Sequence, residues 1–181
     1  GVKKVKIGEK VIVTWISSKG INANPAKYIW RNKRLNGGQV TTFSEYSVCS
    51  ENKLVPLNTG LKGDISPSIG CAWPTGYGLS LTLKKIKKSK TIGIMGLGGI
   101  GMAALLGVLD QNKNATIITY DLNELRLNQA KKLGADLSIN PSKEEVLNKT
   151  DEYTSGKLLD LLIECSGSIV SLNKSLSLIN D

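Results

Sequence analysis

A glycine-rich turn between two apolar runs carries the clearest chemical signal in the chain. Gly96, Gly98 and Gly101 follow the apolar run 92–95. Asp121 ends a second apolar run, twenty residues after Gly101. Gly96 permits a tight turn, Gly98 lets the backbone approach a phosphate without a Cβ, and Gly101 allows a helix to pack closely on a strand. N–H groups at a helix start bind phosphate, and a carboxylate such as that of Asp121 can accept both hydroxyl groups of an adenosine ribose. The spacing therefore indicates a dinucleotide site.

The elements that position these residues alternate regularly after Lys90. Strands are expected at 92–95, 116–121, 135–139 and 158–164, and helices at 99–110, 123–133, 142–154 (capped by Ser142) and 168–179. Such alternation predicts a parallel sheet with right-handed crossovers. In the helix at 123–133 we expect Leu127, Ala130 and Leu133 on the buried side, and Gly134 ends the helix.

The first seventy residues have a different pattern, with short strands and long loops. Strands are expected at 11–15, 39–43 and 45–48, with an extended surface loop over 17–38. Ser66 and Pro67 are typical of a helix start, with Ser66 as the N-cap and Pro67 as the first helical residue. This helix is expected to continue toward Leu83.

Composition excludes several classes of partner. The net charge of +9 would suit a nucleic acid, but the lysines are scattered, only three arginines occur and aromatic residues make up 5%. A solvated, lysine-rich surface is therefore favoured, with an exposed connector at 84–90, and no nucleic-acid partner is expected. No apolar run approaches the ~20 residues of a membrane span, so no membrane partner is expected either.

The three cysteines, Cys49, Cys71 and Cys165, are widely spaced and odd in number. This pattern favours a reducing, cytoplasmic compartment over a disulfide framework. Histidine is absent, which removes the commonest zinc ligand and the commonest general base. The start at Gly1 has neither an initiator Met nor a signal-peptide core, so we expect a chain cut from a longer protein.

Four segments together carry a more specific signal. They are 5–13, 41–46, 70–78 (Gly-Cys-Ala-Trp-Pro-Thr-Gly-Tyr-Gly) and the run 96–140 that includes the glycine turn and Asp121. They resemble, in order and nearly in spacing, the zinc-type alcohol dehydrogenases of the medium-chain dehydrogenase/reductase superfamily. The segment around Cys71 and Thr75 is the part that a generic dinucleotide-binding domain would not have.

The resemblance implies an α/β protein built from two domains. Residues 1–72 would be the C-terminal part of a mostly-β, GroES-like catalytic domain. Residues 73–181 would be an incomplete Rossmann domain, a doubly wound parallel sheet that binds NAD. The implied activity is zinc-dependent hydride transfer between a small alcohol and NAD, with an aldehyde or ketone as the other partner. At full length the resemblance implies a homodimer or homotetramer.

The resemblance also assigns individual residues, each with a plainer alternative. Cys71 matches a catalytic zinc ligand, although most such cysteines are small core residues. Thr75 matches a nicotinamide contact, although a helical threonine often bonds to its own backbone. Ile100 matches an aliphatic residue that packs on the nicotinamide ring. Arg126 matches a basic residue near the adenosine ribose, or is a solvated charge, and Gly167 matches a turn beside the cofactor, or is only a turn glycine. The implied catalytic residues are Cys71 and Thr75, the implied metal ligand is Cys71, and the implied cofactor-binding set is Thr75, Gly96, Gly98, Gly99, Ile100, Gly101, Asp121, Arg126 and Gly167.

The chain also departs from the family pattern. The family's remaining zinc ligands, a cysteine and a histidine followed by glutamate, would precede Gly1, so the 181-residue chain alone is expected to be inactive. Many relatives have four cysteines of a structural zinc in a lobe that corresponds to 17–27, which has none here. Stability there is expected from packing, with Tyr28 and Trp30 as candidates.

Three functions remain open at this point. Asp121 would repel a 2′-phosphate, so an NAD-dependent enzyme is favoured over NADP use. The nearest alternative is a zinc-free, NADPH-dependent quinone or enoyl reductase of the same superfamily, against which Cys71 and Asp121 both weigh. The other is a non-enzymatic module that binds dinucleotides or nucleic acid, against which the scattered lysines weigh.

Overall fold

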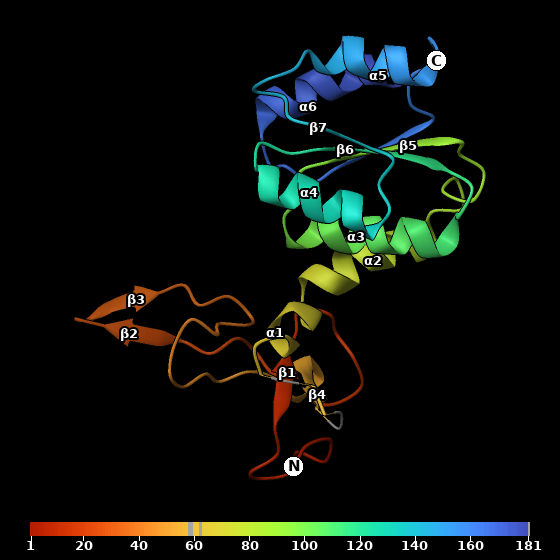
Figure 1. Cartoon of the computed structure of the whole chain (residues 1–181). Coiled ribbons are helices and arrows are strands. Elements are labelled where there is room, and N and C mark those ends of the chain that lie inside the picture. The colour runs from red at the N-terminus through yellow and green to blue at the C-terminus, as the bar shows by residue number, and fades with distance from the viewer. Residues whose placement is uncertain (58–59, 62, 181) are drawn as a thin grey trace. The chain divides into compact units, whose positions relative to one another are not determined.

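The computed structural model describes residues 1–57, 60–61 and 63–180 (Figure 1). The chain forms two compact units, Gly1–Cys71 and Ala72–Asp181. The assignment of residues 1–72 and 73–181 to the two named domains stays a prediction. No helix in the described part of the chain combines the length and the apolar character that crossing a membrane requires.

A four-stranded parallel sheet forms the centre of the second unit. Its strands are β5 (Thr91–Met95), β6 (Thr116–Tyr120), β7 (Leu137–Ile139) and β8 (Leu161–Glu164), in the spatial order β7-β6-β5-β8. In the central register Ile94 is paired with Thr119 on one side and with Ile163 on the other. The strands are apolar on both faces, as expected of a sheet covered by helices on both sides. The predicted α/β fold with a parallel sheet is confirmed.

Helices cover both faces of this sheet (Figure 1). They are α2 (Ala72–Thr82), α3 (Gly99–Gln111), α4 (Glu124–Leu133), α5 (Val146–Thr154) and α6 (Ile169–Ser175), the last followed by the 3₁₀ helix η2 (Leu176–Leu178). Figure 1 shows α2, α3 and α4 on one side and α5 and α6 on the other. Each face has its own core, one around Ile94, Leu105 and Val108, and one around Tyr120 and Ile139. This is the doubly wound arrangement that the resemblance implied.

Two helix predictions in this unit need correction. Leu133 is 45% exposed, because it lies six residues after Leu127 and therefore about 240° around the helix from the buried stripe. The helix expected from 142 begins only at Val146. Ser142 does not cap it, because its hydroxyl donates to Asn140 Oδ1 at 2.7 Å. By contrast, Asn123 caps α4 by accepting from Leu125 N at 2.9 Å.

The first unit contains two small antiparallel pairs. β1 (Val11–Val13) pairs with β4 (Leu54–Pro56), and β2 (Tyr28–Trp30) pairs with β3 (Lys33–Leu35). The β2–β3 hairpin lies within 17–38, so the prediction of an extended loop there was wrong. Its two turn residues, Arg31 and Asn32, have φ of 46° and 60°. Such a turn is usually marked by Asn-Gly or Asp-Gly, and neither is present.

The strands predicted at 39–43 and 45–48 do not form. Hydroxyl groups fold this segment back on itself instead: Ser44 donates to Tyr46 O at 2.7 Å, and Ser47 donates to Thr41 O. Local side-chain bonds of this kind compete with strand pairing.

The long helix expected to start at Ser66 is interrupted. α1 covers only Ser66–Ile69, and α2 begins at Ala72. Pro74 lacks the N–H that would bond Gly70 O in a continuous helix, and its ring would clash with that carbonyl. Ser66 is itself the first helical residue, and Ile65 takes the N-cap position without a side-chain bond.

Hydrogen bonds to Glu51 hold the loop at 17–27. The Glu51 carboxylate, in the 3₁₀ helix η1 (Glu51–Lys53), accepts from Ile21 N at 2.7 Å, Lys3 N at 2.5 Å and Lys4 N at 2.6 Å. These three N–H groups lower the pKa of Glu51 to about 2. Trp30, a predicted packing residue, is exposed, with the Arg31 guanidinium 4.4 Å from its ring centre.

Candidate functional site

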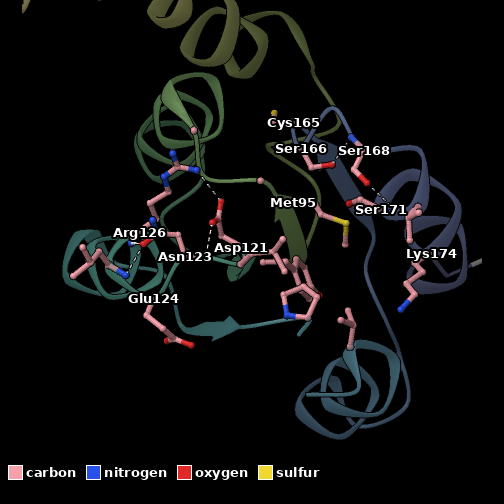
Figure 2. Close-up of a pocket in the computed structure, with 18 residues that line it drawn as sticks. Met95, Asp121, Asn123, Glu124, Arg126, Cys165, Ser166, Ser168, Ser171 and Lys174 are labelled. Carbon is pink, nitrogen blue, oxygen red and sulfur yellow. Dashed lines mark hydrogen bonds and ion pairs between the residues drawn. The ribbon is translucent and has the colours of Figure 1, made fainter. Parts of the chain in front are cut away.

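A cavity of about 810 Å³ lies at the carboxyl ends of β5, β6 and β8. Figure 2 shows Asp121 and Arg126 on one side of it and Ser166, Ser168 and Ser171 on the other. The chain passes from β5 to β6 and β7 on one side of β5, and it then crosses to β8 on the other side. The cavity therefore lies where the chain reverses the direction of its winding. Ligands of open α/β sheets bind at this position.

The three glycines of the turn have different structural roles. Gly96 has φ of 88°, and a Cβ there would lie 2.6 Å from Ser166 N. A Cβ on Gly101 would overlap Gly96 O. Gly98 has φ of −68°, and a Cβ there would have no atom within 4 Å. The fold therefore requires glycine at 96 and 101, whereas at 98 glycine keeps open a space that borders the cavity.

Helix α3 starts directly after this turn. Gly98 is its N-cap, and the first bond of the helix runs from Met102 N to Gly98 O at 2.9 Å. N–H groups of the first turn have no carbonyl partner within a helix, and the helix dipole places partial positive charge there. The start of α3 can therefore bind an anion such as a phosphate.

Asp121 joins the glycine turn to the loop after β6. Its Oδ2 accepts from Leu97 N at 2.6 Å, and its Oδ1 accepts from Asn123 N at 2.8 Å. Arg126 Nη1 is 3.7 Å from Oδ2, with the Arg126 side chain 50% exposed and that of Asp121 8% exposed. An ionised carboxylate has about four acceptor sites, so the Asp121 carboxylate can also accept from ligand hydroxyl groups.

Asn140 fixes the same loop, and its role was missed from the sequence. The residue is 3% exposed, and its Nδ2 donates to Glu124 Oε1 at 2.6 Å and to Leu122 O at 3.2 Å. Glu124 also pairs with Lys143 at 2.8 Å. The hydrogen bonds from Lys143 and Asn140 lower the pKa of Glu124. The Asp121 loop is thus tied to the loop after β7 by a buried amide.

The opposite wall of the cavity follows β8. Cys165 N donates to Met95 O at 2.7 Å, which places the turn 165–168 beside the end of β5. Burial, together with the neighbouring Glu164, raises the pKa of the Cys165 thiol, and this side chain packs against the core of one sheet face. Gly167 has φ of 69°, which allows the chain to turn toward α6.

The structure brings together only part of the predicted residue set. Gly96, Gly98, Asp121 and Arg126 line one cavity. Gly99, Ile100 and Gly101 form the start of helix α3 beside it, and Gly167 lies in the turn after β8. Thr75 is exposed on α2, and Cys71 is an exposed residue at the end of the first unit.

The described residues do not by themselves fit a zinc ion. A zinc site needs three or four ligands, typically Cys, His, Asp or Glu. Within 1–57, 60–61 and 63–180 no three or more such side chains are grouped to hold a metal ion. Cys71 could therefore supply at most one ligand of a zinc site whose other ligands come from elsewhere.

Known proteins with related sequences and structures include several dehydrogenases. Residues 99–181 match the family model described as "Zinc-binding dehydrogenase". Alcohol dehydrogenase 2 of Oryza sativa subsp. japonica is 34% identical over 143 residues, which are 78% of this chain and 37% of that protein. The benzyl alcohol dehydrogenase of Acinetobacter calcoaceticus has 26% identity and a TM-score of 0.65, over 73% of this chain and 36% of that one. An alcohol dehydrogenase of the archaeon Aeropyrum pernix, at 20% identity and a TM-score of 0.66, shares the fold over 77% of this chain and 41% of its own.

Residues 99–181 are therefore similar to zinc-binding dehydrogenases, the resemblance that the motifs of the chain predicted. Its relatives are alcohol dehydrogenases. The chain spans 37% of the length of the rice protein it matches.

Proposed function

We propose that the chain forms the NAD-binding part, with a portion of the catalytic domain, of an alcohol dehydrogenase. The activity of the whole enzyme would be hydride transfer between a small alcohol and NAD, with an aldehyde or ketone formed. The observation that carries the proposal is the position of Gly98 and Asp121 on one cavity at the winding reversal of the sheet. The names of the relatives support an alcohol as the substrate class. Cytoplasmic location and a homodimer or homotetramer stay predictions.

Different residues in and beside the cavity would bind different parts of the dinucleotide. The start of α3 and the open space at Gly98 would take the pyrophosphate. Asp121 would accept the hydroxyl groups of the adenosine ribose, beside Arg126. Ile100 and Thr75 would contact the nicotinamide, which accepts or gives the hydride when bound. Gly167 would let the chain turn at the far wall.

Cys71 is proposed as one ligand of a zinc ion. The remaining ligands are not grouped with it among the described residues. Hydride transfer by the 181-residue chain alone is therefore not expected, and tests of this proposal measure binding.

The glycine turn gives a direct test with the 181-residue chain. We expect Gly98→Ala to raise the Kd for NAD about tenfold or more, because the added Cβ occupies the space left for the pyrophosphate. The melting temperature should stay within about 2 °C of the wild type, because that Cβ meets no protein atom. Isothermal titration calorimetry and thermal denaturation measure the two quantities.

Gly78→Ala is the matched control, because its Cβ would also meet no atom within 4 Å and Gly78 lies on α2, outside the lining of the cavity. This variant should bind NAD as the wild type does. Wild-type chain that bound no NAD, or Gly98→Ala chain that bound it with unchanged Kd, would refute the proposed cofactor site.

A further inference from the structure

A ring of hydrogen bonds builds the wall of the cavity that faces Asp121. Glu164 Oε1 accepts from Ser166 N at 3.0 Å, from the Ser166 hydroxyl, and from Ser171 Oγ at 3.3 Å. The ring continues through Ser168, whose N–H donates to Ser166 Oγ at 3.1 Å and whose Oγ accepts from Ser171 N at 3.3 Å. Glu164 Oε1 thus accepts three of these five hydrogen bonds.

The ring fixes two structural features at once. It holds the tight turn at 165–168, and it includes the bond by which Ser168 caps helix α6. Ser166, Ser168 and Ser171 line the cavity, whereas Glu164, the last residue of β8, is not one of the lining residues. The sequence placed Glu164 only within an apolar strand and gave it no role.

The wall also abuts the glycine turn. Ser166 N and Cα would both lie 2.6 Å from a Cβ on Gly96, so the two turns are in close contact. Cys165 N donates to Met95 O, one residue before Gly96. A displaced 165–168 turn would therefore change the width of the cavity where the glycine turn faces it.

We propose that Glu164 is a positioning residue, which orders the serine wall and thereby sets the affinity of the cavity for the dinucleotide. This inference rests on the proposed function for the identity of the ligand. The ordering of the wall itself does not depend on that identity.

The direction in which NAD affinity changes when Glu164 is replaced distinguishes this positioning role from a direct effect of the Glu164 charge. A dinucleotide carries negative charge on its pyrophosphate, and a nearby carboxylate repels it. If Glu164 acted through its charge alone, removing that charge would tighten binding. If Glu164 orders the wall, removing the acceptor weakens binding, and an uncharged acceptor at the same place restores it.

The test compares Glu164→Ala and Glu164→Gln in the 181-residue chain. Glu164→Ala should raise the Kd for NAD about tenfold, because three donors lose their acceptor. Amide hydrogen exchange at 166–171 should also quicken about tenfold, because the turn loses the bonds that close it. Glu164→Gln keeps a carbonyl oxygen and should restore both quantities to within about threefold of the wild type.

Two further variants complete the design. Glu152→Ala removes a carboxylate from the exposed side of α5, where it pairs with Lys149 at 3.9 Å, and should change neither quantity. Ser171→Ala removes one member of the ring and should give intermediate values, which keeps the inference testable if Glu164→Ala chain does not fold. Tighter NAD binding by both Glu164 variants, or exchange rates equal to the wild type in Glu164→Ala, would overturn the inference. If the wild-type chain binds no NAD, the proposed function fails, and so does the proposal that Glu164 sets the affinity for NAD. In that case the hydrogen-exchange rates alone test whether Glu164 orders the serine wall.

Discussion

Asp121 combines two tasks that the sequence could not separate. Its position after a strand predicted ribose recognition, but its contacts with Leu97 N and Asn123 N also hold two loops together. A substitution of Asp121 therefore changes the shape of the site as well as its charge. Any test of cofactor preference must allow for both effects.

The choice between NAD and NADP is tested by Asp121 together with Arg126. We expect Asp121→Ala to lower the NAD-over-NADP binding preference about tenfold or more, because the carboxylate that repels a 2′-phosphate is gone while Arg126 remains beside it. Fluorescence titration with each cofactor measures the ratio. In the double variant Asp121→Ala/Arg126→Ala, the gain in NADP binding should be lost. If Asp121→Ala acted only by loosening the two loops, it would instead weaken the binding of NAD and of NADP alike. An unchanged ratio in Asp121→Ala would show that this carboxylate does not select NAD.

Site residues could be predicted where their spacing along the chain is characteristic, but not where their roles depend on contacts in the folded chain. Gly96, Gly98 and Asp121 were found because their spacing along the chain is itself the signal. Glu164 and Asn140 were missed, because their roles depend on bonds to partners that only the folded chain brings close. A charged residue that ends the apolar run 161–163 was the one available sign of Glu164.

At the scale of elements, the second unit could be predicted well and the first could not. From β5 to β8, most strands and helices are marked by apolar runs, by periodicity or by local signals such as Gly134, although the start of α5 was misplaced at Ser142. In the first unit the β2–β3 turn lacks glycine, and the loop before it is held by Glu51, thirty residues after Ile21. Such non-local bonds leave no pattern in the sequence.

Glu51 is expected to make the stability of the first unit depend on acid pH. Because the pKa of Glu51 is lowered from 4.5 to about 2 in the folded chain, its contribution to stability is complete above about pH 4.5 and is lost as the pH falls toward 2. In Glu51→Gln chain this part of the pH dependence should disappear, and the unit should unfold at lower denaturant concentration at pH 7. Denaturant unfolding followed by tryptophan fluorescence at several pH values measures both. Glu45→Gln, at an exposed position, is the control, and an identical pH dependence in Glu51→Gln and wild-type chain would contradict the role of Glu51.

At the scale of the whole molecule, the cavity lies entirely within the unit Ala72–Asp181. The first unit has its own hydrogen-bonded framework around Glu51. Ligand binding should therefore stabilise the two units unequally, because only a unit that binds the ligand in its folded state gains free energy from it.

Calorimetry of the 181-residue chain tests this expectation. We expect two unfolding transitions, one for each unit. NAD should raise the melting temperature only of the transition that belongs to the unit Ala72–Asp181. At a free NAD concentration of about 100 times the Kd, that unit should gain about 2.7 kcal/mol. Glu51→Gln should lower the temperature of the other transition and leave the NAD-dependent one in place. At the same NAD concentration, Gly98→Ala should reduce the gain from NAD to about 1.4 kcal/mol or less, as a tenfold or greater rise in Kd requires, and should leave both transitions of the free chain unchanged. A single transition that moves as a whole with NAD and with Glu51→Gln would show that the two units unfold cooperatively, and that the division seen in the structure does not extend to their stability.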